Sequence, residues 1–371
     1  MTQSEISVAF MTDAPRVAGS EFWLLDVLPL LRPAGIVSTV FLRDTEPLNE
    51  IAKRFEAAGV TVRRYADLGT LPDATQDFDL RILQGWTPAT YHRLLPKLRA
   101  PRWVISHDQL DFHYPQPLRA SYAEAYPWTK ALPFRWADGV ITVSEWAGDF
   151  IRRRMGVRDV KVVQNGVKTE RFKPASAEER TTLRQNYGFD GFTVLVPGRF
   201  APEKNQLAAV RAARHAPNLD FVFVGDMDST VGQLAQMLKT RLGLQNVQFW
   251  GRRWDMPDLY RAADVLLQPT LAENQSLVTL EAMSSGLPIV TTDIPAQAEL
   301  VQDGQTGLLV PTDPRLLATA LRALAANPDR AQQFGENARE YVLERHTLEG
   351  TAAKVAELLR GAAEKPLSQL R

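Results

Sequence analysis

Two basic residues in the second half of the chain directly follow an apolar run. Arg199 and Lys204 belong to the stretch PGRFAPEKN, residues 197–205, which lies between a predicted strand and a predicted helix. Ligands of doubly wound folds bind at such crossovers, where helix N–H groups favour anions. Arg as a planar fork and Lys as a point charge both suit a phosphate group. Two exposed basic residues on a loop are the alternative interpretation.

A pair of acidic residues follows a later predicted strand. Glu273 and Glu281 are separated by seven residues in ENQSLVTLEAM, residues 273–283, where a helix is predicted to begin. Free N–H groups near Leu277 and Val278 would lie between the two carboxylates. Carboxylates accept hydrogen bonds from sugar and ribose hydroxyls, and the helix end suits a pyrophosphate. The alternative is one acidic residue that complements the helix dipole and one solvated glutamate.

The first half offers fewer candidates. His107 is one of five histidines, and it follows a predicted strand directly, with Asp108 able to orient its ring. A hydrogen-bonded structural histidine is the alternative. Aromatic residues between Phe112 and Trp136 could stack an acceptor sugar, although core packing explains them better.

Two Asp-x-Asp pairs raise the question of a metal site. Residues 77–79 and 226–228 each fall in a predicted turn, where aspartate is common for backbone reasons. Arg199, Lys204 and a helix dipole already supply the positive charge that a cation would give. We therefore expect no metal and no other cofactor.

The elements that must position these residues alternate along the chain. Short apolar runs bounded by turn residues are separated by segments of helical period, which is typical of βαβ units and parallel sheets. The alternation occurs twice and predicts two Rossmann-like, doubly wound domains. The predicted strands are residues 6–11, 37–42, 60–63, 80–83, 103–106, 140–143 and 160–163, then 193–196, 220–224, 247–250, 265–267, 289–292 and 307–310.

A polar stretch divides the two halves. Residues 166–175 show no apolar period, so we expect a linker and hinge there. The predicted domains are 1–168 and 169–346, and the length of 371 residues suits two. From Pro314 to about Ala363 the pattern predicts one continuous helix, and the segment 347–371 is expected to join the first domain.

Composition narrows the class of protein. Lys plus Arg and Asp plus Glu both number 43, which makes nucleic acid an unexpected partner. Cysteine is absent, so thiolate chemistry is excluded and a cytoplasmic location is the default expectation. No apolar run is long enough for a membrane span, and membrane contact is expected to be peripheral at most, through Arg93, Lys97, Arg99 and Arg102.

Several motifs in sequence resemble the donor domain of family-4 retaining glycosyltransferases. The matching pieces are VLVPGRFAPEKN, FVFVGD, FWGRR, DMPDLYRAADVLLQPTLAEN, SLVTLEAMSSGLPIVTT and AELVQDGQTGLLVP, with VVQNGVKTERFKP before them. A looser match through AGSEFWLLDVLPLL, ISHDQ and ITVSE extends the resemblance to most of the chain. It implies the GT-B fold, in which two such domains face across a cleft, with the acceptor on the N-terminal side and the donor on the C-terminal side.

The resemblance also implies roles. Arg199 and Lys204 would neutralise the donor's phosphates, and Glu273 would bond a hydroxyl of the transferred sugar. Glu281 would hold the ribose, and the N–H groups near Leu277 and Val278 would hold the β-phosphate. In the first domain, Gly19 would let backbone approach the diphosphate, and His107 would meet the sugar near its reacting carbon.

Two departures from the family pattern bear on the donor. Ala18-Gly19 stands where two glycines are usual, and Gln275-Ser276 replaces an aromatic-glycine pair. We expect a hexosyltransferase of carbohydrate biosynthesis that uses a UDP- or GDP-sugar without a metal. The alternatives are a non-catalytic nucleotide-sugar-binding subunit and another GT-B enzyme, such as a phosphorylase or epimerase. A dehydrogenase fits poorly, because neither half has G-x-G-x-x-G after its first strand.

Overall fold

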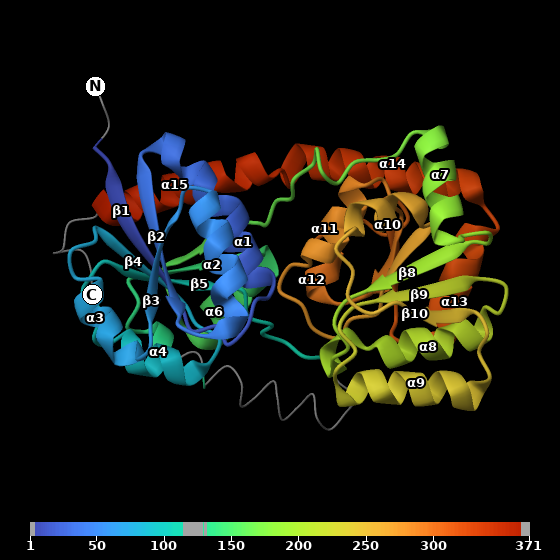
Figure 1. The fold of residues 1–371 in the computed structure, drawn as a ribbon, viewed down its shortest axis with the longest axis horizontal. Coiled ribbons are helices and arrows are strands. Elements are labelled where there is room, and N and C mark those ends of the chain that lie inside the picture. The colour runs from blue at the N-terminus through green and yellow to red at the C-terminus, as the bar shows by residue number, and fades with distance from the viewer. Residues whose placement is uncertain (1–3, 114–128, 130–131, 365–371) are drawn as a thin grey trace. The chain divides into compact units, whose positions relative to one another are not determined.

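The protein forms two compact units, each built on a parallel sheet. The structure is a computed structural model that describes residues 4–113, 129 and 132–364 (Figure 1). Among these, the first unit comprises residues 4–110, the described part of 120–165, and 348–364. The second unit comprises residues 111–113 and 166–347. Residues 166–175, predicted as a linker, therefore belong to the second unit, where Phe172 is buried.

The first unit contains a seven-stranded sheet. Its strands run in the order β3-β2-β1-β4-β5-β6-β7, and each pairs with its neighbour in parallel. Strands β1 and β4 are buried along nearly their whole length, as expected for a sheet covered on both faces. The bounds are β1 Ile6–Thr12, β2 Ile36–Arg43, β3 Thr61–Tyr65, β4 Leu80–Gln84, β5 Arg102–Ser106, β6 Gly139–Thr142 and β7 Val160–Val162.

The second unit repeats this design with six strands. Their order is β10-β9-β8-β11-β12-β13, again all parallel. Every strand predicted from the apolar runs is present, which confirms two doubly wound sheets. The bounds are β8 Thr193–Pro197, β9 Asp220–Val224, β10 Val247–Phe249, β11 Val265–Gln268, β12 Ile289–Thr292 and β13 Gly307–Val310.

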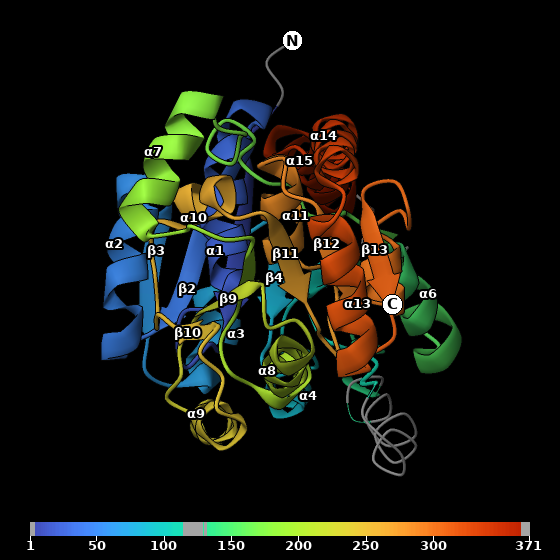
Figure 2. The same ribbon diagram turned by 90° about the vertical axis from the view of Figure 1, so that its right-hand side faces the viewer.

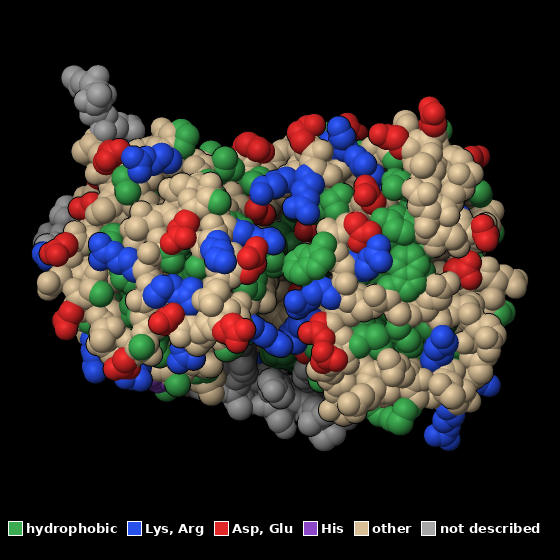
Figure 3. Space-filling view, in the orientation of Figure 1, with side chains coloured by type: hydrophobic (Ala, Val, Ile, Leu, Met, Phe, Trp, Pro, Cys, Tyr) green, Lys and Arg blue, Asp and Glu red, His purple; other side chains and the backbone are tan. Residues whose placement is uncertain are grey.

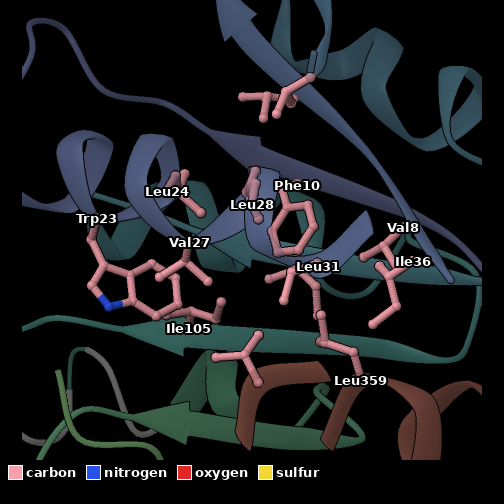
Figure 4. Packing of buried hydrophobic residues seen from close by; sticks show 14 of the residues in the cluster. Val8, Phe10, Trp23, Leu24, Val27, Leu28, Leu31, Ile36, Ile105 and Leu359 are labelled. Carbon is pink, nitrogen blue, oxygen red and sulfur yellow. The ribbon is translucent and has the colours of Figure 1, made fainter. Parts of the chain in front are cut away.

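Helices cover both faces of the first sheet. Helices α1, α2 and α15 pack with the turn η1 on one face, and α4 and α6 belong to the separate core of the other. Figure 4 shows how Trp23, Leu24 and Val27 of α1 lie over Phe10 of β1 and Ile105 of β5. The bounds are α1 Gly19–Val27, η1 Leu28–Ala34, η2 Glu46–Leu48, α2 Asn49–Ala57, η3 Leu68–Thr70, α3 Leu71–Ala74, α4 Pro88–Leu94, α6 Glu145–Met155 and α15 Leu348–Glu364.

Two further layers enclose the second sheet. Helix α8 packs between α9 and α13 on one face, and Figures 1 and 2 both show α8 beside α9. Helices α7, α10, α11 and α14 cover the other face. The bounds are α7 Ala177–Tyr187, η4 Pro202–Lys204, α8 Gln206–His215, α9 Thr230–Leu242, α10 Met256–Ala262, α11 Leu277–Ser284, α12 Pro295–Ala298, α13 Pro314–Ala325 and α14 Pro328–Arg345.

The prediction of one continuous helix after Pro314 is wrong. The chain forms three helices there, with breaks at Asn327 and at His346-Thr347. Asn327 caps α14 through its side chain, and Pro328 has no N–H with which to continue α13. The second break lets α15 place Leu348, Val355 and Leu359 in the core of the first unit.

Candidate functional site

Each sheet has one place where the strand order reverses, and the candidate residues gather at these places. In the second sheet the reversal lies between β8 and β11. The loop after β8 carries Arg199 and Lys204, and the loop after β11 carries Glu273. Because both strands end at the same edge, sequence segments about 70 residues apart meet at the kind of sheet edge where doubly wound folds bind ligands.

The loop after β8 is held by its own neighbours. Gln206, at the start of α8, donates its side-chain amide to the carbonyls of Gly198 and Arg199, at 3.3 and 2.7 Å. Gly225 approaches so closely that an added Cβ would lie 2.1 Å from the Gly198 carbonyl oxygen. Asn205 adopts a left-handed conformation with φ of 54°, which sharply turns the chain into α8. The position of Lys204 is therefore fixed from both sides.

Lys204 and Glu273 form an ion pair across the two loops. The ammonium nitrogen Nζ contacts Oε1 of Glu273, and the two side chains are only 18% and 9% exposed. The Gln268 amide also donates to Oε1 of Glu273, at 3.4 Å. Thr270 and Leu271 bond to the backbone carbonyl of Glu203, which ties the loops together again. The predicted phosphate-binding and sugar-binding residues are thus direct neighbours.

Arg199 also has an acidic partner, Glu203, to which no role was predicted from the sequence. Its guanidinium contacts Oε1 of Glu203, whose side chain is 10% exposed, while Arg199 itself is 53% exposed. Both basic residues of the motif are therefore matched by a carboxylate. An entering anion would meet cations that are already paired, so it must share or replace those contacts.

The N-terminus of α11 provides unpaired donors at the same edge. Ser276 caps the helix, since its hydroxyl accepts the N–H of Thr279 at 3.2 Å. Within the described part of the chain, nothing accepts the N–H of Leu277 or Val278. Such groups and the helix dipole favour an anion, and the predicted contact with a β-phosphate stays a prediction. The serine that departs from the family pattern is thus the residue that starts the helix.

Glu281 is held in place by a buried tyrosine. The hydroxyl of Tyr260 on α10 donates to Oε2 of Glu281 at 3.0 Å. Burial and the neighbouring carboxylate raise the pKa of Tyr260 well above its ordinary value, so it remains a donor at any physiological pH. Tyr260 was missed in the sequence, because no spacing rule links it to a glutamate on a later helix. Glu203 could have been noticed, as an acidic residue between two functional basic ones.

His107 lies at the carboxyl end of β5 in the first unit. Its ring contacts the edge of Trp23, with centroids 5.1 Å apart. Burial lowers the pKa of His107 to about 4, against a smaller opposing effect of Asp108. Its Nε2 is buried without a hydrogen-bond partner among the described residues. The imidazole is therefore neutral near pH 7 and can donate or accept one bond to a ligand.

Gly19 opens helix α1 at the same edge of the first sheet. A Cβ added at Gly19 would meet no atom within 4 Å, so the fold itself does not require glycine there. Ala18 precedes it as the cap of α1 in an extended conformation. The open space agrees with the predicted role of letting a ligand approach the backbone, and that role remains a prediction.

The Asp-x-Asp pairs have structural partners. Asp79 accepts the backbone N–H of Ser7 at 2.8 Å and its hydroxyl at 2.7 Å. Asp226 accepts the N–H of Asp228 at 2.9 Å, as in an Asx turn. Among the residues placed by the structure, no group of three potential ligands could hold a metal ion. Of the aromatic stretch, Phe134 is buried against Tyr91, and residues 114–128 lie outside the described residues.

The basic residues considered for membrane contact are largely engaged elsewhere. Arg93 pairs with Asp67 at 2.8 Å, and Arg102 donates to the carbonyls of Trp136 and Leu98. On the face shown in Figure 3, basic and acidic side chains are interspersed. No helix in the described ranges has the length and apolarity that crossing a membrane requires.

Comparison with protein families agrees with this arrangement. Residues 18–171 match the model described as Glycosyltransferase Family 4, and residues 191–327 match Glycosyl transferases group 1. The chain belongs to the family-4 glycosyltransferases, and the predicted enzyme class is confirmed at this level. It is 30% identical to the alpha-maltose-1-phosphate synthase of Mycolicibacterium smegmatis over 285 residues, which are 68% of this chain and 72% of that protein.

A second relative is the putative glycosyltransferase EpsD of Bacillus subtilis, with 32% identity over 231 residues. That alignment covers 59% of each chain, so it spans less than two thirds of EpsD. Among solved structures, HepE of Anabaena in complex with UDP-glucose aligns with a TM-score of 0.83 and 23% identity, over 96% of this chain and all of that one.

The sucrose-phosphate synthase of Thermosynechococcus elongatus aligns with a TM-score of 0.79 and 21% identity, over 96% of this chain and 99% of that one. At this level of identity the likeness to solved structures concerns the fold. It confirms that the two doubly wound units belong to the GT-B type.

Proposed function

We propose that the protein transfers a sugar from a nucleoside diphosphate donor to an acceptor hydroxyl, with retention at the anomeric carbon. One observation carries the proposal above all. Lys204 and Glu273 are brought into contact at the reversal of the second sheet, beside the unpaired N–H groups at the start of α11. A donor needs both chemistries at one place, because its diphosphate is anionic and its sugar carries hydroxyl groups.

The diphosphate is assigned to the positive end of this site. The ammonium of Lys204 has three N–H donors, so it can bind a phosphate oxygen while it keeps its contact with Glu273. Arg199 and the N–H groups of Leu277 and Val278 complete the set of donors. Such fixed donors stabilise the charge that develops on the leaving diphosphate. The same charges make a divalent cation unnecessary, so we propose that transfer is independent of metal.

The nucleoside and sugar are assigned to the two glutamates. Glu281, oriented by Tyr260, accepts hydroxyl groups of the ribose, and Glu273 accepts a hydroxyl of the transferred sugar. The UDP-glucose bound by HepE supports a UDP-sugar as the first donor to test. In the first unit, His107 and Gly19 remain the residues proposed to act on the sugar and the diphosphate. A cytoplasmic location is proposed from the absence of cysteine alone.

Retention is proposed to occur on one face of the sugar, with the departing phosphate oxygen taking the acceptor proton. The alternative is a double displacement with Glu273 as the nucleophile. The contact with Lys204 lowers the nucleophilicity of Glu273, because the ammonium stabilises its negative charge. Mass spectrometry that finds a glycosyl group on Glu273 would overturn the one-face mechanism.

The experiment that tests this function measures donor binding and turnover together. Purified protein is incubated with UDP-, GDP-, ADP- and dTDP-sugars in EDTA, and both thermal shift and nucleoside diphosphate release are recorded. We expect one donor to raise the melting temperature and to be consumed, with both effects lost in Lys204→Ala and Glu281→Ala. Arg54→Ala, which breaks an exposed pair with Glu50, is the matched control and should leave both unchanged.

Each other outcome has a distinct meaning. Binding without consumption, in the presence of varied acceptors, would favour a non-catalytic subunit. Consumption restored only by added Mg²⁺ or Mn²⁺ would contradict metal independence. Absence of any donor response would contradict the proposed function while leaving the fold unaffected.

A further inference from the structure

Trp86 lies where the strand order of the first sheet reverses. It belongs to none of the motifs from which site residues were predicted. Trp86 is the second residue after β4. The strand order reverses between β1 and β4. The side chain is half-buried, so part of the indole reaches the surface at the carboxyl edge of the sheet. Crevices at such edges are the usual ligand sites of doubly wound folds.

Two carboxylates hold Trp86 by both of its N–H groups. The backbone N–H donates to Oδ1 of Asp13 at 2.6 Å. The indole Nε1–H donates to Oε1 of Glu21 at 3.2 Å. Asp13 directly follows β1, and Glu21 lies in the first turn of α1. The indole is thus fixed at its polar edge, and its orientation does not depend on a ligand.

The carboxylate of Glu21 is held by several hydrogen bonds besides the one from Trp86. The group is fully buried, and it also accepts bonds from Thr12, Ala18, Ser20 and Gln84. No cation of the described residues lies within ion-pair distance of Glu21. Burial raises the pKa of Glu21 against these hydrogen bonds. Burying a carboxylate without a cation is costly, and the hydrogen bonds that offset this cost also fix the position of the acceptor that holds the indole.

The indole of Trp86 differs from the two tryptophans in the core of the first unit, Trp23 and Trp103. Trp23 packs on His107, and Trp103 is buried against Gly139. Within the described residues, neither an aromatic ring nor a cation stacks on Trp86. Thr87, an exposed residue, follows Trp86 in the chain, and its hydroxyl caps α4 and lies 3.5 Å from Oδ2 of Asp13. An apolar face beside polar groups suits a ring that has both kinds of surface.

We propose that Trp86 is the stacking platform for a pyranose ring of the acceptor, with Asp13 and Glu21 as positioning residues. The inference rests on the proposed glycosyl transfer, and it assigns the acceptor's chemical class. One face of a pyranose presents C–H groups that pack on an indole, while its hydroxyl groups point sideways to partners such as Thr87. An aromatic aglycone shares the flat apolar face but lacks those hydroxyl groups.

Saturation-transfer NMR on the full-length protein tests this binding directly. The probes are methyl pyranosides of glucose, galactose, mannose and N-acetylglucosamine, with phenol as the aromatic probe. We expect at least one methyl pyranoside to receive saturation mainly through the hydrogens of one ring face. Trp86→Ala should weaken that saturation about tenfold, and Trp86→Phe should restore most of it.

Matched variants separate positioning from general damage. Trp136→Ala removes an exposed tryptophan that precedes β6, at the opposite edge of the same sheet, and should change nothing. Because Glu21→Gln turns one acceptor oxygen into a donor beside the N–H groups of Ala18 and Trp86, the melting temperature should fall, and the pyranoside saturation measured per folded molecule should weaken too. A purely structural role of Glu21 would lower the melting temperature but leave the pyranoside response of the folded fraction intact.

The outcomes are distinct from those for the donor site. Lys204→Ala should keep pyranoside saturation while it loses the donor response. If the wild-type protein binds pyranosides through Trp86 but binds no donor, the proposed function is refuted. The assignment of Trp86 as a sugar-binding residue would still hold. The platform is refuted by unchanged saturation in Trp86→Ala, by no saturation of any methyl pyranoside, or by a response to phenol alone.

Discussion

The ammonium of Lys204 contacts the carboxylate of Glu273, although 69 positions separate the two residues in the chain. Lys204 ends a short 3-10 turn after β8, and Glu273 lies in the loop after β11. Because β8 and β11 are neighbours in the sheet, their carboxyl ends deliver both side chains to one place. The pair joins the residue assigned to phosphate with the residue assigned to sugar.

Removing the lysine should affect both stability and donor binding. Lys204→Ala leaves Glu273 buried without its cation, which should lower the free energy of unfolding of the second unit by about 3 kcal/mol. Adding Glu273→Gln should recover part of that loss, because no unpaired charge remains. Chemical denaturation of both single variants and the double variant measures the coupling. Additive effects would contradict a direct pair, and Arg54→Ala should change stability by less than about 0.5 kcal/mol.

The hydroxyl of Tyr260 should matter for the donor more than for the fold. Tyr260→Phe keeps the buried ring but removes the donor that holds Glu281. We expect donor affinity to fall about tenfold, since Glu281 loses its fixed orientation. Titration with the nucleoside diphosphate measures this. Tyr341→Phe, which removes a bond to the carbonyl of Glu299 in the same unit, should leave affinity unchanged. An equal effect of both variants would refute the positioning of Glu281.

Two glycines should respond in opposite ways to alanine. Gly19→Ala should change stability by less than about 1 kcal/mol, because the new Cβ meets no atom within 4 Å. It should nevertheless lower kcat/KM for the donor, since the methyl group takes the space assigned to the ligand. Gly225→Ala should destabilise by more than about 3 kcal/mol, because its Cβ would lie 2.1 Å from the Gly198 carbonyl oxygen at φ of 156°. Normal donor kinetics in Gly19→Ala would remove Gly19 from the site.

His107 should make the protein less stable as the pH falls. Its pKa is about 4 in the folded state and about 6.5 when unfolded, so the unfolded chain binds more protons between those values. Above about pH 6.5 His107 is neutral in both states and does not lower the free energy of unfolding. As the pH falls towards 4, protonation of the unfolded chain lowers that free energy by at most about 3 kcal/mol. Denaturation at pH 7 and 4.5 measures the slope. The slope should be shallower in His107→Gln, and equal slopes would contradict a buried neutral imidazole.

Local sequence patterns predict most strands of this fold. Each strand is a short apolar run closed by turn residues, so residues 80–83 and 265–267 could be recognised without knowing what lies beside them. The single helix predicted over residues 314–363 shows the limit of that method, because the structure has three helices there. The apolar period continues through Asn327 and His346, but Pro328 and the cap of Asn327 end α13, and the packing of α15 in the first unit sets the second break.

The sequence alone determined the two parallel sheets, the family, and the residue types able to bind phosphate and hydroxyl groups. These depend on short segments, in which hydrophobic period and motif spacing are complete. The tertiary structure decided which residues are partners: Glu203 for Arg199, Tyr260 for Glu281, and two carboxylates for Trp86. Such contacts join elements that are far apart in the chain. Their geometry follows from strand order and helix packing, and neither can be predicted from a short segment of sequence.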